Sequence, residues 1–182
     1  EDIFRIIAAN TRFPKLLLGD VEAQLGGCYA GRAEMKSVLE RYGSEAVCQA
    51  IALMWHSSET AVAKLLESAP TGTFTASTQL DDDGISEGKR VPVDVAVTIS
   101  DGRLTVDLTG LGDRVAGPFN AGRNGGAIAA ARIAFKYLLA PNTPVNEGDF
   151  ARLDVIIPDG KFLSAPSDAP IGHSGSTVPT VV

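Results

Sequence analysis

The first 70 residues place apolar side chains with the period of an α-helix. In the first run, spacings of four and three residues alternate, and Arg32 is the only charged member: Val21, Leu25, Cys28, Arg32, Met35, Leu39 and Tyr42. The same rhythm resumes after Gly43-Ser44, at Val47, Ile51, Met54, Ser58, Ala61 and Leu65. This spacing is typical of helices packed along a seam.

The junction between the two runs predicts how they are arranged. Gly43 is a natural helix stop and Ser44 a natural N-cap, so we expect an antiparallel helical hairpin within residues 1–70, ended by Pro70. Gly26, Gly27 and Gly31 lie inside the first run, where each costs about 1 kcal/mol relative to alanine. They favour close packing of a neighbouring element, and a break at Gly26-Gly27 is the alternative.

Residues 71–182 change to a period of two, which predicts a β-rich segment. Alternating apolar residues run through 91–99 and 104–108, and Asp101-Gly102 between them predicts a hairpin. The expected pairs on one face are Ile99 with Leu104, Val97 with Val106 and Val95 with Leu108. Further strands are expected at 73–80 and 153–157, with a helix at about 126–140. The predicted class is α+β, with a mainly antiparallel sheet and an inserted helix.

Composition excludes some classes of function. The net charge of −6 and the lack of a basic cluster argue against nucleic-acid binding. No apolar run approaches the roughly 18 residues of a membrane span. Cys28 and Cys48 stand outside any paired motif, so we expect buried thiols in a reducing compartment, hence a cytoplasmic protein. Because the chain opens at Glu1 without an initiator methionine and stops within an apolar run, we expect a fragment of a longer polypeptide.

The standard catalytic motifs are absent from the sequence. It contains no GxxxxGK[ST] loop for ATP, no HExxH and no GxSxG. The two histidines are too few for a multi-histidine metal site, so no metal ligand and no catalytic residue is assigned. His56 lies beside the seam of the second helix and is interpreted as structural. His173, in a glycine-rich loop, is a candidate for contact with a substrate or subunit.

Two acidic segments are further candidates for a site. Asp81-Asp82-Asp83-Gly84 lacks the alternate acidic residues and the final Glu of an EF-hand, so a solvated turn is the better interpretation. Asp107 points away from the apolar stripe, either into solvent or into a groove.

A polar group near the N-terminus consists of Asn10, Arg12, Asp20 and Gln24. Asp20 is placed to cap a helix that begins at Val21, and Gln24 shares its face. One interpretation is therefore a cap plus an Arg–carboxylate pair that holds two helices together. The alternative is that these side chains face a substrate or a partner subunit.

Seven short motifs, in order along the chain, resemble the B-type subunit of the hydantoinase/oxoprolinase family. They are 10–14 (NTRFP), 19–24 (GDVEAQ), 40–43 (ERYG), 81–84 (DDDG), 106–110 (VDLTG), 117–120 (GPFN) and 144–148 (PVNEG). Asn120, in the sixth motif, joins the candidates for a substrate- or subunit-facing role. The family commonly has Gly-Asn where this chain has Gly172-His173, which suggests a divergent subgroup nearer the carboxylases.

The resemblance implies a partner and cofactors. Family members work with an A-type subunit that binds ATP and phosphorylates a small-molecule cyclic amide or ketone. The B-type subunit carries a divalent metal whose ligands lie N-terminal to the region matched here, so the fragment is expected to be metal-free and inactive alone. The implied function is ATP-dependent hydrolysis of a hydantoin, 5-oxoproline or lactam. An ATP-dependent ketone carboxylase and a non-catalytic scaffold or subunit-contact domain are the alternatives.

Overall fold

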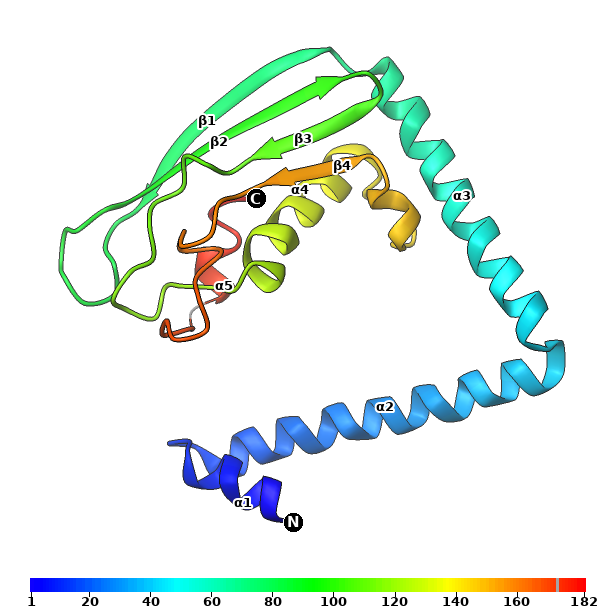
Figure 1. Ribbon diagram of the computed structural model, residues 1–182, viewed down its shortest axis with the longest axis horizontal. Helices are drawn as coiled ribbons and strands as arrows, with labels where there is room; N and C mark the ends of the chain where they lie inside the picture. Colours follow the sequence, from blue (N-terminus) through cyan, green and yellow to red (C-terminus); the bar gives the residue numbers. More distant parts are fainter. Residues whose placement is uncertain (173) are drawn as a thin grey trace. The chain divides into compact units, whose positions relative to one another are not determined.

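The computed structural model describes residues 1–172 and 174–182, and it has an α+β fold in which N-terminal helices precede an open four-stranded sheet (Figure 1). The longer elements, in chain order, are α1 (Asp2–Ala9), α2 (Pro14–Tyr42), α3 (Ser44–Ser68), β1 (Gly72–Leu80), β2 (Val91–Ser100), β3 (Arg103–Asp107), α4 (Ala129–Leu139) and β4 (Leu153–Ile156). The short ones are a π-helical turn η1 (Asn124–Ile128), a 3-10 turn η2 (Glu147–Phe150) and α5 (Ser174–Thr177). The predicted class and the inserted helix are confirmed.

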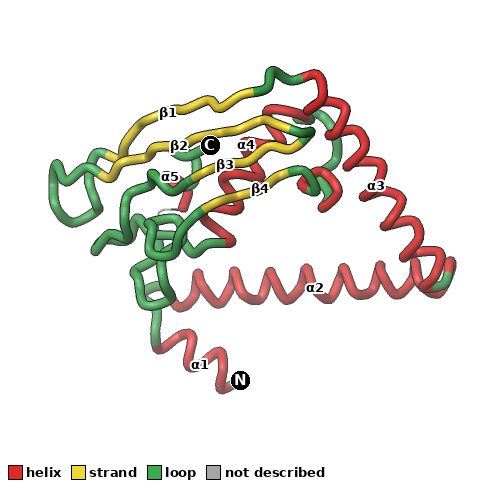
Figure 2. Tube along the Cα trace, turned by 45° about the horizontal axis from the view of Figure 1, so that its top comes forward, coloured by secondary structure: helices red, strands yellow, loops and turns green. Residues whose placement is uncertain are grey.

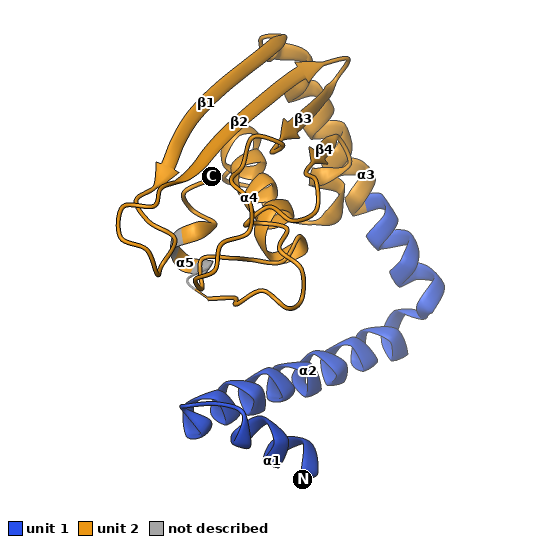
Figure 3. Ribbon diagram, turned by 60° about the vertical axis from the view of Figure 1, so that its left-hand side comes forward, with its two compact units in different colours: residues 1–53 blue, residues 54–182 orange. Residues whose placement is uncertain are grey.

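The chain divides into two compact units, Glu1–Leu53 and Met54–Val182 (Figure 3). The first contains α1, α2 and the beginning of α3, and α1 packs against α2. The second contains the remainder of α3, the sheet and every later element. None of the described helices is long and apolar enough to cross a membrane.

The sheet has the strand order β1-β2-β3-β4 (Figure 2). Strand β4 is parallel to β3, and the other neighbours are antiparallel. The predicted hairpin is confirmed, because Ile99 pairs with Leu104 and Val97 with Val106. Both turn residues have positive φ, 51° at Asp101 and 68° at Gly102, as a type I′ turn requires. The β2–β3 ladder ends at Asp107, so the third expected pair, Val95 with Leu108, lies beyond it.

The apolar face of β2 and β3 contributes the strand residues to the core of the second unit. Leu104 and Val106 on β3 are buried together with Ala127, Ala130 and Phe135, which η1 and α4 supply. Between β3 and β4 the chain passes through α4, and this crossover allows the two strands to run parallel. On the other face Arg103 holds β4 through two 2.7 Å hydrogen bonds to the carboxylate of Asp154.

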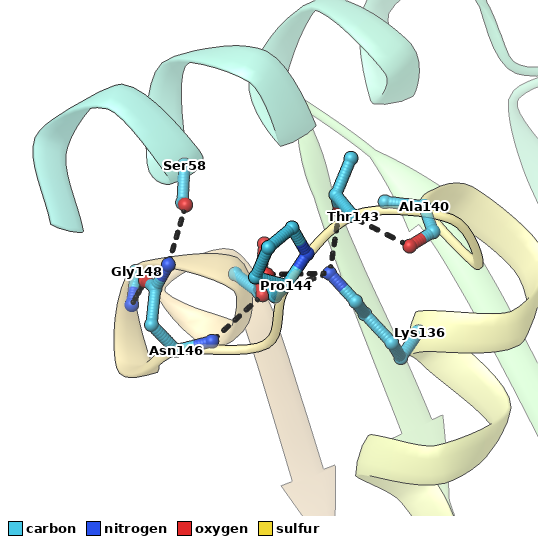
Figure 4. A network of polar contacts seen from close by, with 8 residues as sticks. Ser58, Lys136, Ala140, Thr143, Pro144, Asn146 and Gly148 are labelled. Carbon is cyan, nitrogen blue, oxygen red and sulfur yellow. Dashed lines mark hydrogen bonds and ion pairs between the residues drawn. The ribbon is translucent and has the colours of Figure 1, made fainter. Parts of the chain in front are cut away.

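The C-terminal half of α3 is anchored to the second unit. Val62 and Leu66 are buried in the core, and Glu59 accepts a hydrogen bond from the Arg152 Nε at 3.1 Å. The Ser58 hydroxyl accepts one from the Asn146 amide at 2.8 Å (Figure 4). Apolar burial and polar contacts therefore act together at this end of the helix.

The segment 143–149, which contacts α3 through Asn146, is held in place by the half-buried ammonium group of Lys136. Lys136 Nζ donates to the Asp149 carboxylate at 2.9 Å and to the Thr143 hydroxyl at 2.8 Å (Figure 4). Asp149 also accepts from the Asn146 backbone N–H, which completes a capping box at η2. The motif at 144–148 is thus a structural junction between α4, η2 and α3.

The expected packing of the first helix along its seam is absent. Helix α2 is continuous through Gly26-Gly27, so the break does not occur. However, residues 1–53, all of which the structure describes, include no buried side chain, and Leu25, Met35 and Leu39 are exposed. Nothing lies within 4 Å of a Cβ built on Gly26, Gly27 or Gly31. The two helices meet at Gly43 without the close packing predicted for an antiparallel hairpin.

The cysteines also depart from expectation. Cys28 and Cys48 are free, as predicted, but both are exposed. The expectation of burial followed from the lack of a paired cysteine motif, and it is wrong because residues 1–53 include no buried side chain.

Gly148 provides a test of the α3 junction. A Cβ at this position would overlap the backbone of Trp55 on α3, so we expect Gly148→Ala to lower the free energy of unfolding by about 1–3 kcal/mol. Gly122→Ala is the matched control, because nothing lies within 4 Å of its Cβ position. Urea denaturation of both variants measures the difference, and equal stabilities would contradict the close contact.

Candidate functional site

Three loops meet at the end of the sheet where β1 finishes and β2 begins. They comprise residues 81–90, 108–123 and 157–172, and we call them the loop cluster. A Cβ on Gly117 would overlap the carbonyl of Asp83, and one on Gly84 would press against Pro118 and Phe119. Phe119 forms an isolated bridge with Ile171 from the third loop. Two motifs far apart in sequence, 81–84 and 117–120, are therefore in direct contact.

Asn120 joins two of these loops from a fully buried position. Its side-chain oxygen accepts from the Val115 backbone N–H at 2.9 Å. Its amide nitrogen lies 2.8 Å from the Val115 carbonyl, 2.9 Å from that of Gly117 and 3.0 Å from that of Pro170. These contacts engage both ends of the amide group within the chain, so Asn120 organises the backbone of the cluster.

Asp83 anchors the first loop, for which the sequence predicts only a solvated turn. Its carboxylate is 1% exposed and accepts from the backbone N–H groups of Ser86 at 2.6 Å and Ile85 at 3.0 Å. Lys89 Nζ lies 3.0 Å from the other oxygen. The Ser86 N–H and the Lys89 ammonium are the main causes that lower the pKa of Asp83 to about 2. Asp83 is thus ionised at neutral pH and does not serve as a proton donor there.

Salt bridges tie the other loops together. Arg114 Nη1 lies 3.1 Å from Asp168, and this guanidinium lowers the pKa of the Asp168 carboxyl group. Lys161 Nζ lies 2.9 Å from Asp113. Both pairs connect the second loop to the third, so the cluster has fixed internal contacts.

A pocket of about 210 Å³ opens on the loop cluster. Its lining consists of Leu80, Asp81, Asp82, Phe119 and Thr177. One oxygen of Asp82 accepts from the Gly84 N–H at 2.7 Å. Because this pocket combines carboxylates with an aromatic ring and an aliphatic side chain, it can accept hydrogen bonds from a small ligand and cover its apolar part.

A second hollow, of about 280 Å³, lies on the polar face of the sheet. Asp94 and Asp107 line it together with Thr75, Ser77 and Thr109. The prediction that Asp107 points away from the apolar stripe is consistent with this position, which is a groove. Its carboxylate accepts from the Thr109 N–H at 2.8 Å.

The N-terminal candidates lie in the first unit, and the expected cap and ion pair are not formed. Helix α2 begins at Pro14, so Asp20 lies in its second turn and does not cap it. Asn10 ends α1, where its amide donates to the Ile6 carbonyl at 2.8 Å. The side chains of Arg12, Asp20 and Gln24 are exposed, and none forms a hydrogen bond or ion pair with another described residue.

The remaining candidates concern the histidines and metal binding. His173 lies outside the described residues, and His56 is exposed on α3. Within 1–172 and 174–182, no group of three or more His, Cys, Asp or Glu side chains could hold a metal ion.

Sequence reasoning missed the anchoring roles of Asp83 and Lys136. Asp83 precedes Ser86 by three positions, a spacing at which an aspartate accepts backbone N–H bonds, and this local pattern could have indicated the turn. Asn146-x-x-Asp149 is similarly a recognisable capping pattern. No local signal indicates that Lys136 reaches Asp149, because that contact depends on how α4 packs.

Comparison with known proteins identifies the family. The family model described as hydantoinase B/oxoprolinase matches residues 1–182. The chain belongs to this family. Its relatives include hydantoinase, 5-oxoprolinase and caprolactamase proteins as well as carboxylases.

Two curated relatives and one solved structure illustrate the range of this hydantoinase B/oxoprolinase family. The B-type subunit of a putative D-/L-hydantoinase from Pseudomonas sp. (strain NS671) is 30% identical, over 92% of this chain and 30% of the relative. The acetophenone carboxylase delta subunit from Aromatoleum aromaticum is 24% identical, over 85% of this chain and 22% of the relative. The crystal structure of the ATP-dependent caprolactamase from Pseudomonas jessenii matches with a TM-score of 0.85 at 21% identity, covering 99% of this chain and 31% of that one.

These matches define what is common to the hydantoinase B/oxoprolinase relatives. The chain spans about 30% of the length of the hydantoinase subunit that it matches. Three of the relatives are named as subunits of enzymes: the hydantoinase, the acetophenone carboxylase and the caprolactamase proteins. The match to the caprolactamase structure shows that the two proteins share a fold over this region.

Asn120 provides the first test of the loop cluster. Asn120→Ala leaves a buried N–H group and three carbonyl groups without their partner, so we expect a loss of about 2–4 kcal/mol in the free energy of unfolding. Asn124→Ala, at an exposed position nearby, is the control and should change stability by about 0.5 kcal/mol or less. Similar values for the two variants would rule out the anchoring role.

Asp83 gives the cluster a defined dependence on pH. Its pKa is depressed in the folded state, so its stabilising effect is complete above about pH 4, the pKa of an unfolded aspartate, and is lost as pH falls toward 2. The stability difference between the unmodified protein and Asp83→Asn should therefore be constant near neutral pH and shrink between pH 4 and pH 2. Asp81→Asn, at an exposed carboxylate, is the comparison variant. Denaturation series across this range measure both differences, and a constant Asp83→Asn difference would contradict the anchor.

Proposed function

We propose that this chain is part of the B-type subunit of an ATP-dependent hydrolase of cyclic amides. The observation that carries the proposal is the 30% identity to the B-type subunit of a putative hydantoinase, over 92% of this chain. A caprolactamase with the same fold supports it, because caprolactam is also a cyclic amide. In this proposal ATP is bound by a separate or fused A-type subunit, which activates the substrate. The divalent metal is held by ligands outside this chain, which on its own is inactive.

The pocket on the loop cluster suits a substrate of this class. A lactam or hydantoin ring has an N–H group that donates and carbon atoms that are apolar. The carboxylates of Asp81 and Asp82 accept hydrogen bonds, while Leu80 and Phe119 offer apolar surface. The role proposed for this chain is to bind and orient the ring, while Asn120 and Asp83 hold the loops in place.

A ketone carboxylase is the second candidate. It is favoured by the 24% identity to the acetophenone carboxylase delta subunit, over 85% of this chain. Turnover by such an enzyme requires bicarbonate as a second substrate, whereas hydrolysis of a cyclic amide requires only water.

A scaffold or subunit-contact role is a third candidate, of a different class. It is favoured by the exposed side chains of the first unit, where Arg12, Asp20 and Gln24 have no partner among the described residues. It is also favoured by the structural engagement of Asn120 and Asp83 within the loop cluster. This role places the substrate elsewhere in the enzyme.

The proposed reaction is tested by ADP release from the full-length enzyme with its A-type partner. The substrates are a panel of lactams, hydantoins and ketones, each with and without bicarbonate. We expect release that is triggered by a cyclic amide and is independent of bicarbonate. Release that requires both a ketone and bicarbonate would replace the hydrolase with the carboxylase.

The scaffold alternative is tested by variants in the same full-length enzyme. Arg12→Ala and Asp20→Ala should change assembly or stability, but not substrate dependence, if the first unit only makes subunit contacts. Lys15→Ala, which removes an exposed charge on α2, controls for general loss of surface charge. Normal assembly combined with lost turnover in the first two variants would exclude the scaffold role.

A further inference from the structure

Helix α2 has an apolar face that no described residue of the first unit buries from Leu25 onward. Its 29 residues include no buried side chain. Four internal glycines, Gly19, Gly26, Gly27 and Gly31, lower its intrinsic stability, and most of the stability of protein helices comes from tertiary packing of an apolar face. The exposed apolar side chains are large: Tyr29 is 66% exposed and Met35 is 48% exposed. Such a surface marks an interaction site.

The exposed face has the geometry of a coiled-coil seam. The alternating spacing of four and three residues continues from Val21 to Tyr42, and from Leu25 onward every seam position is exposed. The stretch from Leu25 to Leu39 is about 22 Å long. A shallow groove of about 520 Å³ lies on this part of the first unit, lined by Arg32, Met35, Lys36, Leu39, Glu40 and Ser44. The groove and the seam share Arg32, Met35 and Leu39.

The charges on the helix favour pairing with itself in an antiparallel orientation. Glu22 and Lys36 both directly follow a seam position and lie nearly equally far from Ala30, on opposite sides of it. In an antiparallel pair centred near Ala30, Glu22 of each copy lies beside Lys36 of the other copy, which gives two such contacts per dimer. A parallel pair in register would instead place the two Arg32 guanidinium groups against each other. Charge therefore selects the antiparallel arrangement.

The same register matches the seam residues. Leu25 lies opposite Met35 of the other copy, and Cys28 lies opposite Arg32, close to the aromatic ring of Tyr29. Gly31 flanks the seam near the twofold axis, and nothing lies within 4 Å of its Cβ position, so the two backbones can approach closely there. We propose that a second copy of this chain occupies the seam of α2, forming an antiparallel helix pair about a twofold axis near Ala30.

Charge exchange tests the orientation of this pair. Glu22→Lys alone and Lys36→Glu alone each turn two attractive contacts into repulsive ones, so each should weaken dimerisation of the full chain about tenfold at low salt. The double variant Glu22→Lys/Lys36→Glu should return the dissociation constant to that of the unmodified chain. Analytical ultracentrifugation measures all four proteins. Glu34→Lys, a charge change away from the seam, is the control and should leave dimerisation unchanged.

A cross-link tests the register independently. In a chain with Cys48→Ser, the substitution Arg32→Cys places the new thiol opposite Cys28 of the second copy, so mild oxidation should give a covalent dimer on a non-reducing gel. Adding Cys28→Ser should abolish the cross-link. A chain that stays monomeric at about 100 μM would overturn the proposal, because the seam would then be covered by a different subunit or by a further segment of polypeptide. A dimer that the charge exchange does not affect would overturn it as well.

Discussion

The second unit is held together by burial of the inner face of β2 and β3. The inner side chains of β2 and β3 are apolar, and a sheet with one such face is stable only when another layer covers it. Helix α4 and the turn before it provide that layer with small residues, Ala127 and Ala130, which allow close approach, and with Phe135. Helix α4 also connects β3 to β4. The same segment therefore covers the sheet and allows β4 to join it as a parallel edge strand.

The loops beyond this core are held by buried polar groups with fully engaged partners. Asn120, Asp83 and Asp149 are almost completely buried, and each accepts or donates several hydrogen bonds. Loss of one partner would leave a desolvated group unpaired, which costs more than an ordinary surface hydrogen bond contributes. The loop cluster thus keeps its form without secondary structure of its own. Fixed loops of this kind suit the proposed role of Asp81 and Asp82 in binding a small molecule.

The two units differ in how their apolar residues are used. In Met54–Val182 apolar side chains such as Leu104, Leu108 and Phe162 converge on one core, whereas Glu1–Leu53 has no buried side chain and exposes large apolar residues along its helices. The first unit is therefore suited to association, and the second to holding a loop-based site. Both properties, association with another chain and a loop-based site, are consistent with relatives that are named as enzyme subunits. The proposed antiparallel pairing of α2 assigns the exposed residues a specific role.

Elements governed by local rules could be predicted from the residues alone. The hairpin at Asp101-Gly102, the strand before it and α4 follow from residue periodicity and from turn residues that tolerate positive φ. The family motifs were also visible without coordinates. Which motifs meet could be learned only from the folded chain, because the contact of Gly117 with Asp83 and the reach of Asn120 to Pro170 join segments far apart in the sequence. The exposure of the α2 seam and of both cysteines likewise emerged only from the fold, since an apolar stripe specifies that a helix needs a partner but not where that partner comes from.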